Sequence, residues 1–366
     1  MFVVFLCDFR MMSSKKVMIC AVFFVSLFLL SSLAVVASGT SSTKTVIPNL
    51  APVRIGAHSM TIASAPTTVD CTKAPYCVYV TDLSSDDLQV IQGSRFVGEI
   101  SISGVTIGAA YDPNNEMVYV GGYSCECVYV INAKTEVVSA SINISSYGPA
   151  SAVVYSTTSK MIYAATYSDP GYYMVIDPST NKIVTAISAC GYYPEFGDQL
   201  NKGNVYFASL ESSSSYGCVN AINPITNKIV ATARLSDDYA IGVAVNSGNK
   251  EVYVNGELCQ CVYIFTSALK KVTTLKIGSY LWGSWSNDRL QTVYVAPGIY
   301  PIYKNNTVGA PIPVGGGDTG CGLGKENYVP FYSSGGVVAL IKNNQVVKDI
   351  QTDGTDLFGC TATVES

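Results

Sequence analysis

The side chains best suited to binding chemistry are acidic and aromatic, and they cluster in a few short segments. The acidic ones are Glu195, Asp198, Asp237, Asp238, Asp318 and Asp356. The aromatic ones are Tyr147, Tyr192, Tyr193, Tyr239, Tyr280 and Trp282. Aromatic rings offer stacking or cation-π surface and carboxylates accept several hydrogen bonds, so this set could bind a cation such as Ca²⁺, an amine or a sugar. Polar loop tips and tyrosines packed between structural units would give the same list.

Cysteines form the second reactive set. Cys7 and Cys20 lie in an apolar N-terminal stretch, which leaves ten: Cys71, Cys77, Cys125, Cys127, Cys190, Cys218, Cys259, Cys261, Cys321 and Cys360. An even number of cysteines in an exported chain predicts disulfides. We expect Cys71 to pair with Cys77 across a short turn, Cys190 with Cys218, and Cys321 with Cys360.

Two Cys-x-Cys pairs, Cys125 with Cys127 and Cys259 with Cys261, occupy the same position in two separate repeats. These repeats are not neighbours, so each pair must act within itself. A ring of three residues stabilises a fold by roughly 1.6 kcal/mol in the loop-entropy model, so stability alone explains the pairs poorly. A local staple, a redox-active dithiol and a thiolate metal site remain as interpretations, although no histidine accompanies the sulfurs.

Several reaction classes lack their residues. The chain has one histidine, His58, which lies before the first clear repeat, so a Ser-His-Asp triad or a histidine metal site inside the repeats is excluded. Gly315-Gly316-Gly317 precedes a strand and is typical of a loop, not of a phosphate cradle. The net charge of -4, with Lys and Arg scattered singly, gives no footprint for nucleic acid.

The elements that must position these residues are repeats centred on a tyrosine. Six copies of a Val-Tyr-Val-like core hold Tyr79, Tyr119, Tyr163, Tyr206, Tyr253 and Tyr294, with steps of 40, 44, 43, 47 and 41 residues. A degraded seventh copy is expected between Tyr328 and Tyr332. A period near 40 with short β-branched and aromatic runs, and no 3.6-residue stripe, predicts a β-propeller. The predicted fold is all-β, with seven blades of four antiparallel strands.

Each repeat divides into four strands, as in 240–245, 251–255, 261–265 and 271–277. Turns such as Asp177 to Lys182 and Asn223 to Lys228 join the third strand to the fourth, since Asx side chains cap a turn and proline presets φ. The segment 356–365 resembles a first strand. We therefore expect the N- and C-terminal segments to pair and close the ring, although the strand that completes the first blade is ambiguous.

The repeats resemble the YVTN β-propeller family, known largely from surface and secreted proteins of archaea and bacteria. Val78-Tyr79-Val80-Thr81-Asp82 and the turn Asp177 to Lys182 followed by Ile183-Val184 carry the likeness, which covers roughly residues 61 to 352. The resemblance implies the fold and a surface location. It implies no activity, because function does not follow from a widely used fold.

The N-terminus predicts export. Lys15 and Lys16 precede an uncharged run from Val17 to Ala37, and Val35 and Ala37 suit a signal-peptidase site. An uncleaved membrane anchor is the alternative, because this uncharged run of 21 residues can span a bilayer as a helix. The expected organisation is a signal peptide or anchor (1–37), a linker (38–60) and the propeller (61–366). Asn143 and Asn305 begin glycosylation sequons.

These observations favour a non-enzymatic interaction module, secreted or on the outer face of the cell membrane, with a cell-envelope protein or glycan as partner. We expect the six acidic residues named above to lie in loops that enter first strands, all near one mouth of the central channel. An extracellular lactonase or lyase with a metal held by these carboxylates is therefore the first alternative. A thiol-redox protein using the Cys-x-Cys pairs is the second.

Overall fold

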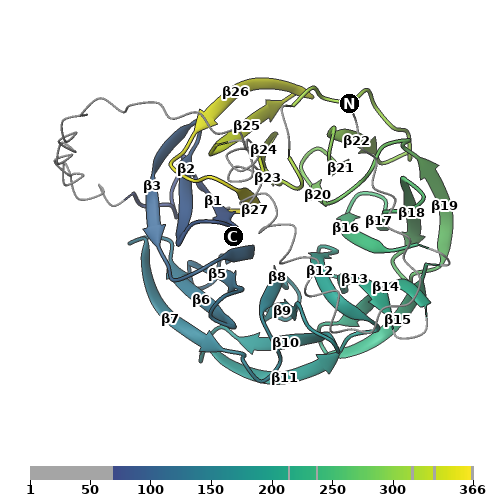
Figure 1. Cartoon of the computed structure of the whole chain (residues 1–366), viewed down its shortest axis with the longest axis horizontal. Coiled ribbons are helices and arrows are strands. Elements are labelled where there is room, and N and C mark those ends of the chain that lie inside the picture. The colour runs from purple at the N-terminus through teal and green to yellow at the C-terminus, as the bar shows by residue number, and fades with distance from the viewer. Residues whose placement is uncertain (1–68, 213–214, 236–237, 315–316, 333–334, 364–366) are drawn as a thin grey trace, which may run out of the picture. The chain divides into compact units, whose positions relative to one another are not determined.

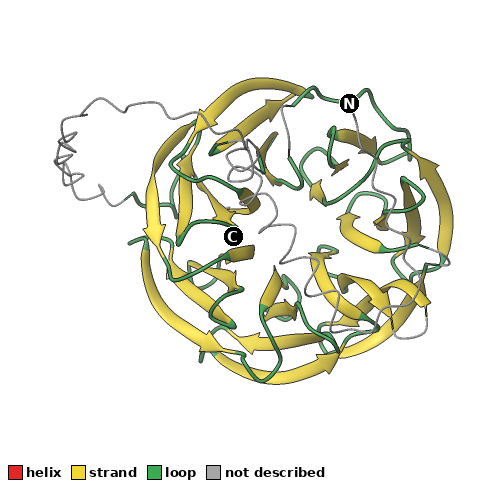
Figure 2. Ribbon diagram, in the orientation of Figure 1, coloured by secondary structure: helices red, strands yellow, loops and turns green. Residues whose placement is uncertain are grey.

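The computed structural model describes residues 69–212, 215–235, 238–314, 317–332 and 335–363, and everything below concerns these residues. They form a ring of seven antiparallel sheets, with no helix among them (Figure 2). No described segment is a helix long and apolar enough to cross a membrane. The predicted export segment, linker and His58 lie outside the described residues.

The sheets follow one another around the ring as blades (Figure 1). From the centre outward, blade 1 consists of β27 (Leu357–Ala362), β1 (Cys77–Asp82), β2 (Asp87–Gln92) and β3 (Arg95–Ser101), and blade 2 of β4 (Thr106–Asp112), β5 (Met117–Gly122), β6 (Cys127–Asn132) and β7 (Val137–Asn143). Blade 3 consists of β8 (Ala150–Tyr155), β9 (Ile162–Thr166), β10 (Tyr172–Asp177) and β11 (Lys182–Ser188), and blade 4 of β12 (Tyr192–Gln199), β13 (Val205–Ser212), β14 (Ser215–Asn223) and β15 (Lys228–Arg234).

Blade 5 consists of β16 (Ala240–Asn246), β17 (Glu251–Gly256), β18 (Cys261–Thr266) and β19 (Lys271–Lys276), and blade 6 of β20 (Ser284–Asn287), β21 (Thr292–Val295) and β22 (Tyr300–Tyr303). Blade 7 consists of β23 (Cys321–Leu323), β24 (Glu326–Pro330), β25 (Val337–Lys342) and β26 (Gln345–Gln351). In blade 6 the outer strand shrinks to a single bridge between Ile302 and Val308. The predicted seven-bladed, four-stranded plan is therefore confirmed, with one abbreviated outer position.

Burial explains why the strands differ in sequence. The second and third strands are covered on both sides by neighbouring blades, so β5 and β6 are almost wholly buried. The outermost strands alternate instead, because one of their faces meets solvent, as in β7 and β15. The hydrophobic core consequently lies between blades and not within one central mass, as where Val154 and Tyr163 of blade 3 pack with Val205 and Phe207 of blade 4.

The repeat tyrosine holds adjacent blades together. The seven tyrosines are at most 1% exposed, and Tyr328, not Tyr332, is the seventh copy. In six blades the hydroxyl donates a hydrogen bond to the turn between third and fourth strands of the next blade. The bonds run from Tyr119 to Asn181, Tyr163 to Asn227, Tyr206 to Ser267, Tyr253 to Asn306, Tyr294 to Asn344 and Tyr328 to Gly93.

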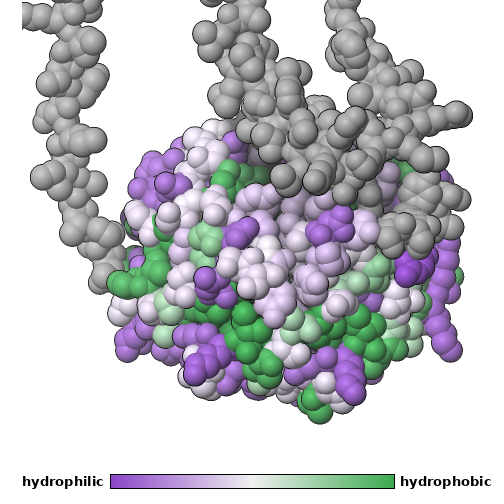
Figure 3. Space-filling model, turned by 60° about the horizontal axis from the view of Figure 1, so that its bottom comes forward, coloured by the Kyte–Doolittle hydropathy of each residue, from purple (hydrophilic) through white to green (hydrophobic). Residues whose placement is uncertain are grey.

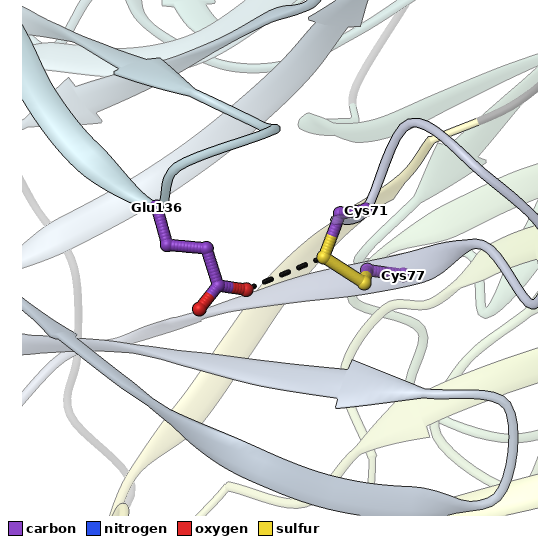
Figure 4. A group of neighbouring side chains, drawn as sticks. All are labelled: Cys71, Cys77 and Glu136. Atoms are coloured by element: carbon purple, nitrogen blue, oxygen red, sulfur yellow. Dashed lines mark hydrogen bonds between the residues drawn. A yellow bond between two sulfur atoms is a disulfide. The ribbon is translucent and has the colours of Figure 1, made fainter. Parts of the chain in front are cut away.

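Blade 1 departs from this pattern. Tyr79 Oη is buried and has no hydrogen-bond partner. At the turn position where the next two blades carry Asn181 and Asn227, blade 2 carries Glu136, and all three residues have positive φ. The Glu136 carboxyl lies against the Cys71–Cys77 disulfide, with Oε1 3.3 Å from Cys71 Sγ (Figure 4). A disulfide sulfur carries no proton, so this contact is not a hydrogen bond.

The C-terminal strand completes the first blade. β27 pairs antiparallel with β1, where Val78 lies opposite Ala362 and Val80 opposite Cys360. Asp82 fastens this junction by accepting hydrogen bonds from the Thr355 and Asp356 backbone amides at 2.8 and 3.3 Å. The Cys321–Cys360 disulfide joins the inner strands of blades 7 and 1. The predicted closure is correct, and the strand left ambiguous by the sequence is β27.

The ten described cysteines form five disulfides, and each lies within the pair expected from the sequence: Cys71–Cys77, Cys125–Cys127, Cys190–Cys218, Cys259–Cys261 and Cys321–Cys360. Both Cys-x-Cys bonds close on themselves. Each connects the turn after a second strand to the first residue of the third strand, in blades 2 and 5.

Candidate functional site

The inner strands of all seven blades line a central cavity of about 390 Å³. Small residues let these strands approach one another near the axis of the ring. A Cβ on Gly108 would lie 2.7 Å from the Ser151 carbonyl oxygen, and one on Gly359 would clash with the Ile107 carbonyl. Phe196 of blade 4 and Phe358 of blade 1 meet across the channel, with ring centroids 5.9 Å apart. The two rings therefore obstruct the channel between opposite walls.

Aromatic rings gather at the mouth where the inner strands begin. Tyr123, Tyr167 and Tyr193 form a chain of contacts across blades 2, 3 and 4, with centroids 5.9 and 4.7 Å apart. Tyr280 and Trp282 form a second pair at the entry to blade 6, 6.1 Å apart. All five rings are partly or largely exposed. This mouth thus offers flat rings on both sides of the channel, the kind of surface on which a sugar or cation can stack.

Carboxyl groups accompany these rings. Glu195 lines the cavity, and burial followed by the charge of Glu257 raises its pKa to about 8. Burial also raises the pKa of Asp318 and of Glu257, and the Tyr280 hydroxyl donates to Glu257 Oε1 at 3.1 Å. No described residue donates a hydrogen bond to the Glu195 carboxyl. The raised pKa favours the protonated form of Glu195, which can both donate a hydrogen bond to a ligand and accept one from it.

Asp198 belongs to the opposite mouth. We expected it in a loop leading into blade 4, which is wrong, because β12 already begins at Tyr192 and Asp198 is its seventh residue. Its Oδ2 accepts hydrogen bonds from the Val245 amide at 2.8 Å and from the Ser286 hydroxyl at 3.1 Å. Burial raises its pKa to about 7 despite these bonds. Asp198 thereby ties blade 4 to blades 5 and 6.

Asp238 is a buried turn residue at the first mouth. It is 1% exposed and lies directly before β16, next to the Cys259–Cys261 disulfide. The remaining predicted residues, Tyr147, Tyr192, Tyr239 and Asp356, also lie on the face where the inner strands begin. Asp237 lies outside the described residues. Asn143 and Asn305 are exposed, and their glycosylation stays a prediction.

Three mouth residues were missed by the sequence analysis: Tyr123, Tyr167 and Glu257. Each directly follows the second strand of its blade. The second strand runs back toward the start of the first, so the loops after both kinds of strand open on the same face. Their position four residues after the repeat tyrosine is the signal that could have identified them.

Donor atoms that could hold a metal come together twice in the described residues. One group is Asp238 with Cys259 and Cys261, and the other is Glu136 with Cys71 and Cys77. In both groups the sulfurs are joined in a disulfide. Neither group contains Glu195, Asp198, Asp318 or Asp356.

Charged residues are few in this chain. Only 13% of the chain is charged, and the face in Figure 3 is mostly pale, with strongly hydrophilic residues scattered among hydrophobic patches. Polar recognition on the described surface therefore depends on hydroxyl, amide and aromatic groups more than on clustered charge.

Comparisons with known proteins show the fold. No family model matches the chain, and no curated protein matches it. Hydrazine synthase from Kuenenia stuttgartiensis is similar in structure, with a TM-score of 0.64 and 15% identity over 72% of this chain and 92% of that one. A chain from a crystal structure of a nidogen/laminin complex is also similar, with a TM-score of 0.51 and 11% identity over 79% of this chain and 99% of that one.

Proposed function

We propose that this chain is an exported, non-enzymatic binding module of the YVTN propeller type, and that it binds a glycan of the cell envelope at the tyrosine-rich mouth. The observation that carries the proposal is the set of aromatic rings around carboxyl groups whose pKa is raised by burial. Sugars combine apolar ring faces with hydroxyl groups, so they match stacking surfaces flanked by hydrogen-bonding groups.

Export is supported by the five disulfides, because such bonds persist in oxidising compartments. The similar propeller of the nidogen/laminin complex occurs in an assembly of proteins, so an envelope protein is the alternative partner for the same face. A calcium ion at this mouth, or the metal of a metal-dependent hydrolase there, would need several carboxylate oxygens close enough together to coordinate one ion. Glu195, Asp318 and Asp356 form no three-donor group within the described residues.

Tryptophan fluorescence gives a direct test. The chain has two tryptophans, Trp282 at the mouth and Trp285, which is buried and stacked on Tyr294. A Trp285→Phe variant leaves Trp282 as the single reporter. We expect binders found on a glycan array to change its emission in a saturable way, and Tyr193→Ala to weaken their binding about fivefold or more, since one stacking contact is worth ~1 kcal/mol.

Tyr303→Ala is the matched control, because Tyr303 is 37% exposed on an outer turn of blade 6. It should leave binding unchanged. A glycan array without binders, combined with capture of an envelope protein that Tyr193→Ala abolishes, would replace the glycan with a protein partner. Equal loss of binding in both tyrosine variants would show that the mouth is not the binding site.

A further inference from the structure

The Cys259–Cys261 disulfide has a carboxylate built in beside it. Both sulfurs and an oxygen of Asp238 lie within 4.8 Å of one another. Asp238 is 1% exposed and Cys261 is 1% exposed, while Cys259 is partly exposed at the mouth face. A Cβ on Gly256 would clash with the Asp238 carboxylate and approach Cys259 Sγ at 2.8 Å. A residue with a side chain therefore does not fit at this position unless its neighbours move.

Four donors fix the orientation of this carboxylate. Oδ1 accepts from the amides of Tyr239 and Leu258 at 2.9 and 2.7 Å. Oδ2 accepts from the Tyr263 hydroxyl at 3.0 Å and from the Cys259 amide at 3.3 Å. The last bond is the longest of the four and comes from the turn that holds the sulfurs. Oδ2 is therefore the oxygen that could exchange a weak hydrogen bond for a metal ion.

Blade 2 provides the same disulfide without the carboxylate. Cys125–Cys127 has the same spacing and repeat position. There Tyr129, the counterpart of Tyr263, donates to the Ser103 backbone carbonyl. No aspartate or glutamate completes a three-donor group with these sulfurs in the described part of the chain. The carboxylate of blade 5 is thus not required to form a Cys-x-Cys turn.

The other three-donor group is closed to solvent. Cys71 and Cys77 are both 0% exposed, and Glu136 covers one of the sulfurs (Figure 4). Neither a reductant nor a metal ion reaches that disulfide in the folded protein. Of the two groups, only the one in blade 5 has a sulfur at the surface.

We propose that reduction of Cys259–Cys261 opens a binding site for one thiophilic divalent cation of the zinc class, ligated by Asp238, Cys259 Sγ and Cys261 Sγ. A dithiol supplies two electrons and two protons, so the protein disulfide becomes two thiols and the dithiol becomes a disulfide. The cation then displaces both thiol protons, and two thiolates with one carboxylate leave a net charge of -1. A fourth position stays open toward the mouth.

The geometry allows this arrangement. Zinc-sulfur bonds of about 2.3 Å in a tetrahedral site place two sulfurs roughly 3.8 Å apart. The Cα atoms of Cys259 and Cys261 are 5.2 Å apart, so side-chain rotation alone can separate the sulfurs. This proposal is independent of glycan binding at the mouth.

Cadmium is a suitable probe, because its thiolate complexes absorb in the ultraviolet. The full chain is treated with graded amounts of a phosphine reductant, thiols are counted by mass spectrometry after alkylation, and cadmium chloride is titrated. We expect one equivalent of cadmium to bind the reduced protein and a Cys125→Ser/Cys127→Ser variant alike. The oxidised protein and a Cys259→Ser/Cys261→Ser variant should show no thiolate band.

Asp238→Asn should weaken cadmium binding at least tenfold with an unchanged thiol count. Because Asp238 also caps the turn, Cys259→Ala serves as a second variant: it should abolish binding and leave the melting temperature of the reduced protein unchanged. Cadmium binding that survives in Cys259→Ser/Cys261→Ser, or that depends on Cys125 and Cys127, would overturn the proposal. An unchanged affinity in Asp238→Asn would remove the carboxylate from the site.

Discussion

The ring and the hydroxyl of the repeat tyrosine have separate roles. The ring fills the space between blades, whereas the hydroxyl reaches the next blade and bonds to a turn. The bond from Tyr253 to Asn306 Oδ1 is 2.6 Å long, and Asn249 Nδ2 donates back to the same hydroxyl at 2.8 Å. Tyr79 has the same buried ring without a partner for its oxygen. The chain therefore contains its own comparison between a bonded and an unbonded tyrosine.

Replacing these tyrosines with phenylalanine separates the two roles. Tyr253→Phe should lower the free energy of unfolding by about 1–2 kcal/mol, because it leaves the asparagine groups without their partner. Tyr79→Phe should be neutral or slightly stabilising, because it removes a buried hydroxyl that already lacks a bond. Urea unfolding of the oxidised proteins measures both. Equal losses in the two variants would mean that the hydroxyl does not act as an inter-blade link.

Single residues also show which features of the structure can be predicted from the sequence and which cannot. The tyrosine spacing predicts seven blades because every blade buries the same side chain. The loss of the link at Tyr79 could not be predicted, since Glu136 resembles an ordinary turn residue until its counterparts Asn181 and Asn227 are seen to accept hydrogen bonds.

At the scale of elements, strand boundaries decide which residues reach the mouth. The loop prediction for Asp198 failed because β12 is eight residues long and carries a bulge between Pro194 and Phe196. Glu195 lines the cavity from within that strand. Alternation of side chains along a strand is predictable, but a bulge shifts it by one residue and has no clear sequence signal here.

The stability that each disulfide adds to the fold depends on the elements that it connects. Cys321–Cys360 joins two inner strands 39 residues apart in sequence, whereas Cys125–Cys127 closes a turn. In the loop-entropy model the first bond stabilises by about 4 kcal/mol and the second by roughly 1.6 kcal/mol. We expect Cys321→Ser/Cys360→Ser to lower the denaturation midpoint clearly more than Cys125→Ser/Cys127→Ser, as followed by circular dichroism in urea. The reverse order would show that closure of the ring does not depend on the Cys321–Cys360 disulfide.

At the scale of the whole molecule, buried carboxyls link stability to pH. Burial raises the pKa of Glu136 and Asp198 to about 7 and that of Glu195 to about 8. Between the unfolded values near 4 and these folded values, the native state binds more protons than the unfolded chain. Stability from these groups is thus full below about pH 4 and is lost as the pH rises through 7 to 8.

The melting temperature should therefore fall from pH 5 to pH 9, by an amount on the order of 5 °C. Glu195→Gln should flatten the upper part of this profile, because the variant has no proton to lose there. Glu116→Gln, on an exposed turn, is the control and should keep the wild-type slope. A profile that rises with pH, or one that Glu195→Gln leaves unchanged, would contradict the assignment of Glu195 as an acid with a raised pKa. Calorimetry at constant ionic strength provides the measurement.

The pairing of β27 with β1 also sets the order in which the protein can be completed. Synthesis delivers β1 well before β27, so the inner edge of blade 1 stays open until the chain has emerged as far as β27. An open strand edge is a template for pairing with other chains, and contacts between distant segments form slowly. A nascent chain arrested before residue 357 would consequently present Val78, Tyr79 and Val80 as an unpaired strand edge to which other chains could bind.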